Sequence, residues 1–169
     1  MAFTIRIALT ACFWTALASG HASLEQGASA AVTISGDIPS TVALTAGDLA
    51  KMPREKISIP EKDGTKTEYE GVPLREILKR AGAPSGKDLR GKALATYVLA
   101  KARDGYRVVF TLAEVAPEFA NEQILLADER DGKRMDANQG PFRLVCPNDK
   151  AGARSVRMLQ AIEIVRLSR

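Results

Sequence analysis

The sequence predicts a single domain over residues 31–169 of the α+β class, mostly β, with a mixed-sheet or barrel-like arrangement and a few short helices. Two observations carry this prediction. From residue 31 onward, short runs rich in β-branched and aromatic residues are separated by turn residues at short intervals. In the same region only two or three segments place apolar residues three and four positions apart, which is the spacing of a helix.

The strand-like runs are short, and each is bounded by turn residues. Asp104-Gly105 and Asp131-Gly132 are expected to be hairpin turns, because glycine accepts the positive φ angle of a tight turn. The lysine-rich stretch over residues 61–66 is expected to be a solvated loop. The predicted strands are residues 32–35, 41–44, 56–59, 95–100, 106–110, 124–127, 142–146 and 161–167.

The expected helices are marked by their ends. A short helix is expected after Thr45, whose side chain is a good cap for the exposed amides of a first turn. The clearest helix covers residues 75–81, and Gly82 is expected to end it in a left-handed conformation. A third begins at Thr111, which forms a capping box with Glu114, and Pro117 is expected to cut or kink it.

The first residues are typical of a secretory signal peptide. Arg6 is followed by an almost uncharged apolar run over residues 7–18, and small residues come next. The signal peptide is expected to cover residues 1–22, with alternative cleavage sites after Ala18 and Ala30. This apolar run is too short to span a bilayer. The mature chain is expected to have no transmembrane segment and to be periplasmic or secreted.

Composition excludes several classes of function. The chain has 24 Lys and Arg against 20 Asp and Glu, and the two signs are interleaved, whereas a nucleic-acid surface needs clustered positive charge. The one histidine is His21, in the predicted signal peptide, so histidine-based catalysis and His-ligated zinc are excluded. Cys12 is lost with the same segment, which leaves Cys146 alone and predicts no intramolecular disulfide.

The last third of the sequence resembles the end of the molybdopterin-binding domain of sulfite-oxidase-type enzymes. Gly140-Pro141-Phe142-Arg143 is similar to a Gly-x-Pro-x-Arg strand of that family. Gly152-Ala153-Arg154-Ser155-Val156-Arg157 is similar to the family's Gly-Ala-Arg-x-Val-Lys-Trp segment. Further segments follow the family's order, so that the resemblance spans roughly the whole mature chain: residues 34–37, 71–74, 104–106, 125–127 and 131–133.

The resemblance implies the fold of that domain and a site for the pterin and its phosphate. The matching positions are Arg143 and Arg157, with Gly152, Arg154 and Ser155 in the loop between them. Guanidinium groups and loop amides together suit an anion. In the competing interpretation, arginines on an exposed strand face and a turn are simply solvated.

The sequence also departs from the family. The resemblance places a cysteine that binds molybdenum between the opening strands and the 71–74 segment, but residues 57–63 contain none, and no neighbouring residue replaces a soft thiolate. Asn138-Gln139 stands where the family has a histidine, and Met158 where it has a tryptophan. No cofactor is therefore expected, although molybdopterin is implied by the family.

Two remaining features have a structural and a functional interpretation. Cys146 lies on the predicted strand that carries Arg143, and its neighbours Arg143 and Lys150 would lower its pKa. A free cysteine is most often a buried apolar residue, however, and we expect that role. The acidic pairs lack a companion group that would raise a carboxyl pKa and are expected to be surface charges. These pairs are Asp128 with Glu129 and Glu114 with Glu118.

Three hypotheses about function follow. In the first, the domain is a non-catalytic pseudoenzyme that binds an anionic small molecule, or a periplasmic or membrane protein partner, in the former pterin groove. In the second, it is a divergent molybdopterin-dependent oxidoreductase that keeps the cofactor without the usual cysteine, or through Cys146. In the third, it has a purely structural or assembly role and presents an exposed apolar patch.

Overall fold

The computed structural model describes residues 30–61, 63–136 and 138–167, so the predicted signal peptide lies outside the described part of the chain. The strands are β1 (Ala31–Gly36), β2 (Val42–Thr45), β3 (Glu55–Pro60), β4 (Lys66–Pro73), β5 (Thr96–Ala102), β6 (Arg107–Thr111), β7 (Leu125–Arg130), β8 (Lys133–Arg134), β9 (Arg143–Val145) and β10 (Leu159–Arg166). The helices are α1 (Ala46–Leu49), α2 (Leu74–Arg80) and α3 (Leu112–Val115), with short 3-10 helices η1 (Gly86–Asp88), η2 (Gly91–Ala95) and η3 (Gly152–Arg154).

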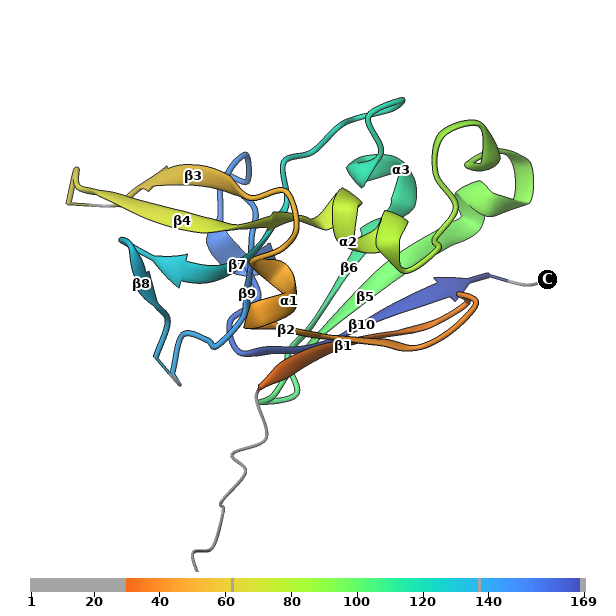
Figure 1. The fold of residues 1–169 in the computed structure, drawn as a ribbon. Helices are drawn as coiled ribbons and strands as arrows, with labels where there is room; N and C mark the ends of the chain where they lie inside the picture. Colours follow the sequence, from red (N-terminus) through yellow and green to blue (C-terminus); the bar gives the residue numbers. More distant parts are fainter. Residues whose placement is uncertain (1–29, 62, 137, 168–169) are drawn as a thin grey trace, which may run out of the picture.

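The strands form two five-stranded sheets. Sheet A has the order β2-β1-β10-β5-β6, and only its β1–β10 pair is parallel among the pairings of the described residues. Sheet B has the order β3-β4-β7-β8, with β9 also paired to β7. Figure 1 shows the three α-helices on one side of sheet A and sheet B at the opposite end of the molecule from η1 and η2. In the described residues both sheets are open, so the predicted α+β class is confirmed in its mixed-sheet form.

The element ends confirm the local signals in the sequence. Thr45 and Thr111 both form capping boxes, with Asp48 and Glu114, and α3 stops before Pro117. Gly82 ends the α2 segment with a φ of +81°. The two predicted hairpin turns join β5 to β6 and β7 to β8, and all eight predicted strands are present with shifted ends.

Two strands were not expected. β4 alternates charged outward residues with buried ones, and its outward glutamates Glu68 and Glu70 pair with Lys56 and Arg54 at the side of the same sheet. Such a run has the composition of a solvated loop, since the cations that balance its glutamates lie elsewhere, Lys56 on β3 and Arg54 just before it. The other strand, β8, has only two residues and depends on its hairpin partner β7.

The main core connects the two sheets. It joins Ile34, Val98 and Ile162 of sheet A to Leu126 and Leu144 of sheet B, all fully buried. A smaller satellite core lies on sheet B and is separate from the main core. It consists of Tyr69, Leu125, Ala127 and Val145. No helix of the described residues is long and apolar enough to cross a membrane.

Gly71 shows why the Gly-Val-Pro-Leu segment begins with glycine. A Cβ at this position would lie 2.0 Å from the carbonyl oxygen of Leu126 on β7, a distance that no side chain tolerates. The β4–β7 pairing also shifts register between Glu70 and Gly71. Glycine here therefore lets β7 approach, and β7 in turn positions β9, which carries Arg143.

Candidate functional site

The chain after β9 folds back beside that strand and brings two arginines together. The backbone N–H of Leu144 donates to the carbonyl of Val156 at 2.9 Å, and the N–H of Leu159 donates to the carbonyl of Phe142 at 2.8 Å. Arg143 and Arg157 lie within the short segments between these two hydrogen bonds. The backbone therefore holds two cations as neighbours, and the charge of Arg157 contributes to lowering the pKa of Arg143.

Arg143 is half-buried against the satellite core. Its guanidinium lies 5.0 Å from the ring centre of Tyr69, and its Nη1 donates to Tyr69 Oη at 2.9 Å and to Gln139 Oε1 at 3.1 Å. Its Nε is buried and has no hydrogen-bond partner among the described residues. Burial is the main cause that lowers the Arg143 pKa, and no described carboxylate forms an ion pair with this guanidinium.

A third arginine, Arg130, belongs to the same face of sheet B. It is the cross-strand partner of Tyr69, and its charge also lowers the Arg143 pKa. Its Nη2 donates to Thr67 Oγ1 at 3.4 Å, and that hydroxyl donates to Glu61 Oε1 at 2.8 Å. We call Arg130, Arg143 and Arg157 the guanidinium cluster. Arg130 could not be predicted from the sequence, because its pairing with Tyr69 on a distant strand is not visible as a local pattern.

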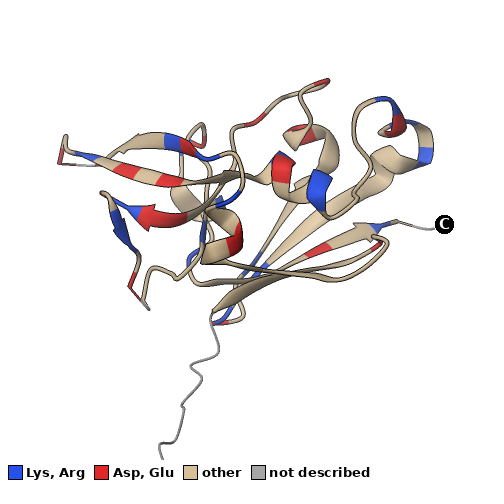
Figure 2. Cartoon of the chain, viewed as in Figure 1, with Lys and Arg blue, Asp and Glu red and all other residues tan. Residues whose placement is uncertain are grey.

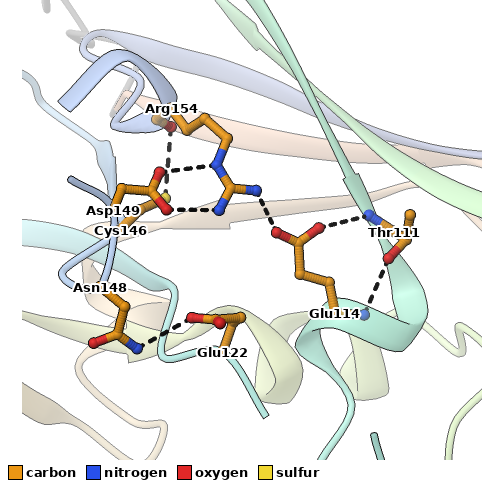
Figure 3. Close-up of polar contacts among 7 residues, drawn as sticks. All are labelled: Thr111, Glu114, Glu122, Cys146, Asn148, Asp149 and Arg154. Atoms are coloured by element: carbon orange, nitrogen blue, oxygen red, sulfur yellow. Dashed lines mark hydrogen bonds and ion pairs between the residues drawn. The ribbon is translucent and has the colours of Figure 1, made fainter. Parts of the chain in front are cut away.

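Arg154 has a different environment (Figure 3). Its Nε and Nη2 donate to the two carboxylate oxygens of Asp149 at 2.8 and 2.6 Å, and its Nη1 contacts Glu114. The guanidinium also lies 5.3 Å from the ring centre of Phe110 on β6. Its hydrogen bonds to Asp149 and Glu114 raise the Arg154 pKa. Arg154 therefore ties the loop to α3 and shares no contact residue with Arg143.

The other two predicted binding residues lie in the same loop. Ser155 Oγ accepts the backbone N–H of Cys146 at 3.0 Å, which closes the loop onto the end of β9. Gly152 is exposed at the start of η3, and a Cβ there would meet open space. Of the five residues predicted to bind a cofactor, the structure brings Arg143 and Arg157 together, while Gly152, Arg154 and Ser155 shape the loop between them. That these five residues bind a cofactor stays a prediction.

Cys146 is buried, as expected, with 6 % of its surface exposed. Its thiol donates to the carbonyl of Arg154 at 3.6 Å. Burial, supported by the charge of Asp149, raises the pKa of the thiol to about 12. The cation that opposes this shift is Arg154, whereas the sequence suggested Arg143 and Lys150.

One expectation about carboxylates is wrong. Asp128 was expected at the surface, but it is only 4 % exposed and lies 3.0 Å from Arg54 Nη2. Arg54 also pairs with Glu70 at 2.8 Å, so one partly buried guanidinium joins β4 to β7. The Glu114 carboxylate also has partners within the protein, since it pairs with Arg154 and accepts the backbone N–H of Thr111 at the start of α3.

The described residues do not fit the metal half of a molybdopterin cofactor. The span that the family uses for its thiolate contains Glu61, whose carboxylate accepts a hydrogen bond from Thr67. The described thiol, Cys146, is protonated at neutral pH and hydrogen-bonded to backbone. No group of three or more His, Cys, Asp or Glu side chains in the described chain is arranged to hold a metal ion. The guanidinium cluster, in contrast, fits the anionic half.

Comparison with known proteins agrees with this fold. The sequence model of the oxidoreductase molybdopterin binding domain family matches residues 21–168. A search of curated proteins found no significant match. Among solved structures, the sulfane dehydrogenase SoxCD from Paracoccus pantotrophus is similar, with 20 % identity and a TM-score of 0.62. The match covers 80 % of this chain but 38 % of that one, so the likeness is one of fold. The chain belongs to the oxidoreductase molybdopterin binding domain family and has its sulfite-oxidase-like fold.

Proposed function

We propose that this chain is an exported, non-catalytic member of its family that binds an anionic small molecule at the guanidinium cluster. One observation carries the proposal. Arg143 and Arg157 are held as neighbours by backbone hydrogen bonds, and Arg143 has a buried Nε without a hydrogen-bond partner in the described chain. Like charges held side by side repel each other, and an anion between them relieves that repulsion. The unpaired buried Nε adds a cost that no described residue offsets.

The donor set supports the non-catalytic part of the proposal. A molybdenum centre of this family type needs a thiolate, and the thiol pKa of Cys146 is about 12. Burial lowers the Arg143 pKa overall, and the charge of Glu61 offsets only a small part of that effect. The second candidate, a divergent molybdopterin oxidoreductase, is favoured by family membership.

Metal and pterin analysis separates the two candidates. The full chain is expressed in a molybdopterin-competent host, the mature protein is purified, and molybdenum is measured together with pterin fluorescence after oxidation. We expect neither in stoichiometric amount. Near-stoichiometric molybdenum would overturn the proposal in favour of the oxidoreductase, and repeating the measurement with Cys146→Ser shows whether that thiol holds the metal.

Calorimetric titration tests the anion site itself. Orthophosphate is titrated into the mature protein, Arg143→Gln, Arg157→Gln and the matched control Arg107→Gln, an exposed arginine on β6 outside the cluster. Each cluster variant is expected to weaken binding by about tenfold or more, since it removes charge-assisted hydrogen bonds. The control is expected within about twofold of wild type. No measurable binding to wild type, or equal losses in all three variants, would refute an anion site here.

A further inference from the structure

The hairpin between β7 and β8 forms a second cationic surface next to the guanidinium cluster. Asp131 and Gly132 take positive φ angles of 50° and 73°, which turns the chain tightly and places Lys133 opposite Arg130. A hollow of about 290 Å³ lies against this hairpin. Figure 2 shows β8 as a basic segment at the sheet B end of the molecule. The lining residues are Arg130, Asp131, Lys133, Arg134, Met135, Asp136 and Gln139.

The carboxylates of this hollow are engaged by the protein. Asp131 Oδ1 accepts the backbone N–H of Glu68 at 2.9 Å, and its Oδ2 lies 3.3 Å from Arg130 Nε. Asp136 Oδ1 accepts the backbone N–H groups of Asn138 at 2.8 Å and Gln139 at 3.0 Å. Both acids therefore stabilise turns, and neither forms an ion pair with Lys133 or Arg134, so the three cations that line the hollow exceed its two carboxylates.

Lys133 and Arg134 form no ion pair with any described residue. Both are exposed. The cross-strand neighbour of Arg134 is Glu129, and that carboxylate lies 3.6 Å from Arg54 Nη2 instead. Both β8 cations line the hollow, Lys133 on the sheet face of Arg130 and Arg134 on the face of Glu129, and neither forms an ion pair with a described residue.

The hollow and the guanidinium cluster are continuous. Gln139 lines the hollow, and its Oε1 accepts the hydrogen bond from Arg143 Nη1. Arg130 lines the hollow and also belongs to the cluster, as its effect on the Arg143 pKa shows. Four cationic side chains therefore follow one another from the returning chain, across β9 and β7, to β8, namely Arg157, Arg143, Arg130 and Lys133, and Arg134 joins this cationic row as a lining residue of the hollow.

We propose that this cationic row binds a ligand with several linked phosphate groups, one at Arg143 and Arg157 and the next in the hollow at Lys133 and Arg134. A single tetrahedral anion contacts one end of the row, whereas an oligophosphate reaches both. The inference rests on the proposed function, because it takes the guanidinium cluster as the first binding position.

The test compares tripolyphosphate with orthophosphate by calorimetric titration in buffer free of divalent cations. The wild-type mature protein is expected to bind tripolyphosphate at least about tenfold more tightly than orthophosphate. Lys133→Ala combined with Arg134→Ala is expected to abolish that preference and to keep orthophosphate affinity within about twofold. A matched control, Lys87→Ala with Lys92→Ala, removes the same charge from η1 and η2 and is expected to keep the preference.

The outcomes distinguish this inference from the proposed function. If wild type binds both anions equally, or if the Lys87 and Lys92 control loses the preference as fully as the β8 variant, the second binding position is refuted while the first stands. If Arg143→Gln leaves the binding of both anions unchanged, the proposed function itself fails. Preference lost only in the β8 variant supports the inference.

Discussion

At the scale of single residues, Cys146 illustrates how burial decides chemistry. The thiol is enclosed by the end of β9 and the following loop, and its pKa is raised to about 12, mainly by burial. At pH 8 a thiol with this pKa is ionised in about one molecule in ten thousand. The residue therefore acts as a small apolar side chain of the core.

We predict that Cys146 reacts slowly with a thiolate-specific disulfide reagent in the folded protein at pH 8. The absorbance of the released thiol measures the rate, and the same protein in guanidinium chloride should react at the rate of a free cysteine. Cys146→Ser provides the blank. Equal rates in the folded and unfolded protein would mean that the thiol is accessible and that its pKa is ordinary.

At the scale of elements, the connection from β9 to β10 depends on a clamp around Arg154. Asp149 holds this guanidinium by two hydrogen bonds, and Glu114 ties it to the first turn of α3. Tyr106 Oη adds a hydrogen bond to the carbonyl of Ala153 at 2.7 Å. These contacts fix the segment between β9 and β10, which holds Arg157 next to Arg143.

We predict that Asp149→Asn lowers the free energy of unfolding by about 1–2 kcal/mol, the usual worth of hydrogen bonds to a charged group at a partly exposed position. Urea unfolding followed by circular dichroism measures it. The control Glu118→Gln, an exposed acid that forms no ion pair in the described chain, should change the value by less than about 0.5 kcal/mol.

The interaction between Asp149 and Arg154 also makes the stability of the fold depend on pH in the acid range. Hydrogen bonding to Arg154 lowers the folded-state pKa of Asp149 below its ordinary value of 3.8. The stabilisation is therefore complete above pH 3.8 and is lost as the pH falls through the lowered folded-state pKa. The difference in stability between wild type and Asp149→Asn should accordingly shrink below that pH, and a difference independent of pH would contradict the assignment.

At the scale of the whole molecule, the two sheets share the main core, in which Val98 of sheet A and Leu126 of sheet B are both fully buried. Neither sheet can lose its partner without exposing that core. We predict a single cooperative unfolding transition, with coincident curves from circular dichroism and calorimetry. A reducing agent should leave the midpoint unchanged, because Cys146 is a free thiol. Two separated transitions would show that the sheets are independent units.

Much of the fold could be predicted because its signals are local. A capping box acts over three residues, as at Thr45 and Thr111, and a strand is visible from its own alternation. β4 could not be predicted from its own residues, because its glutamates form ion pairs with Lys56 and Arg54, which lie earlier in the chain. The sequence left the choice between a mixed sheet and a barrel-like arrangement open for a related reason, since sheet order depends on pairings between distant strands.

The site divides in the same way. Sequence by itself determined that the chain has the arginines, the loop and the family motifs of an anion site, and that residues 57–63 lack a thiol. Tertiary structure alone decided which arginines remain available: Arg154 is bound by carboxylates five and forty residues away, whereas Arg143 faces Arg157 and Arg130 without one. The physical reason is that the free energy of a charged group depends on what surrounds it in space, and only the folded chain brings those surroundings together.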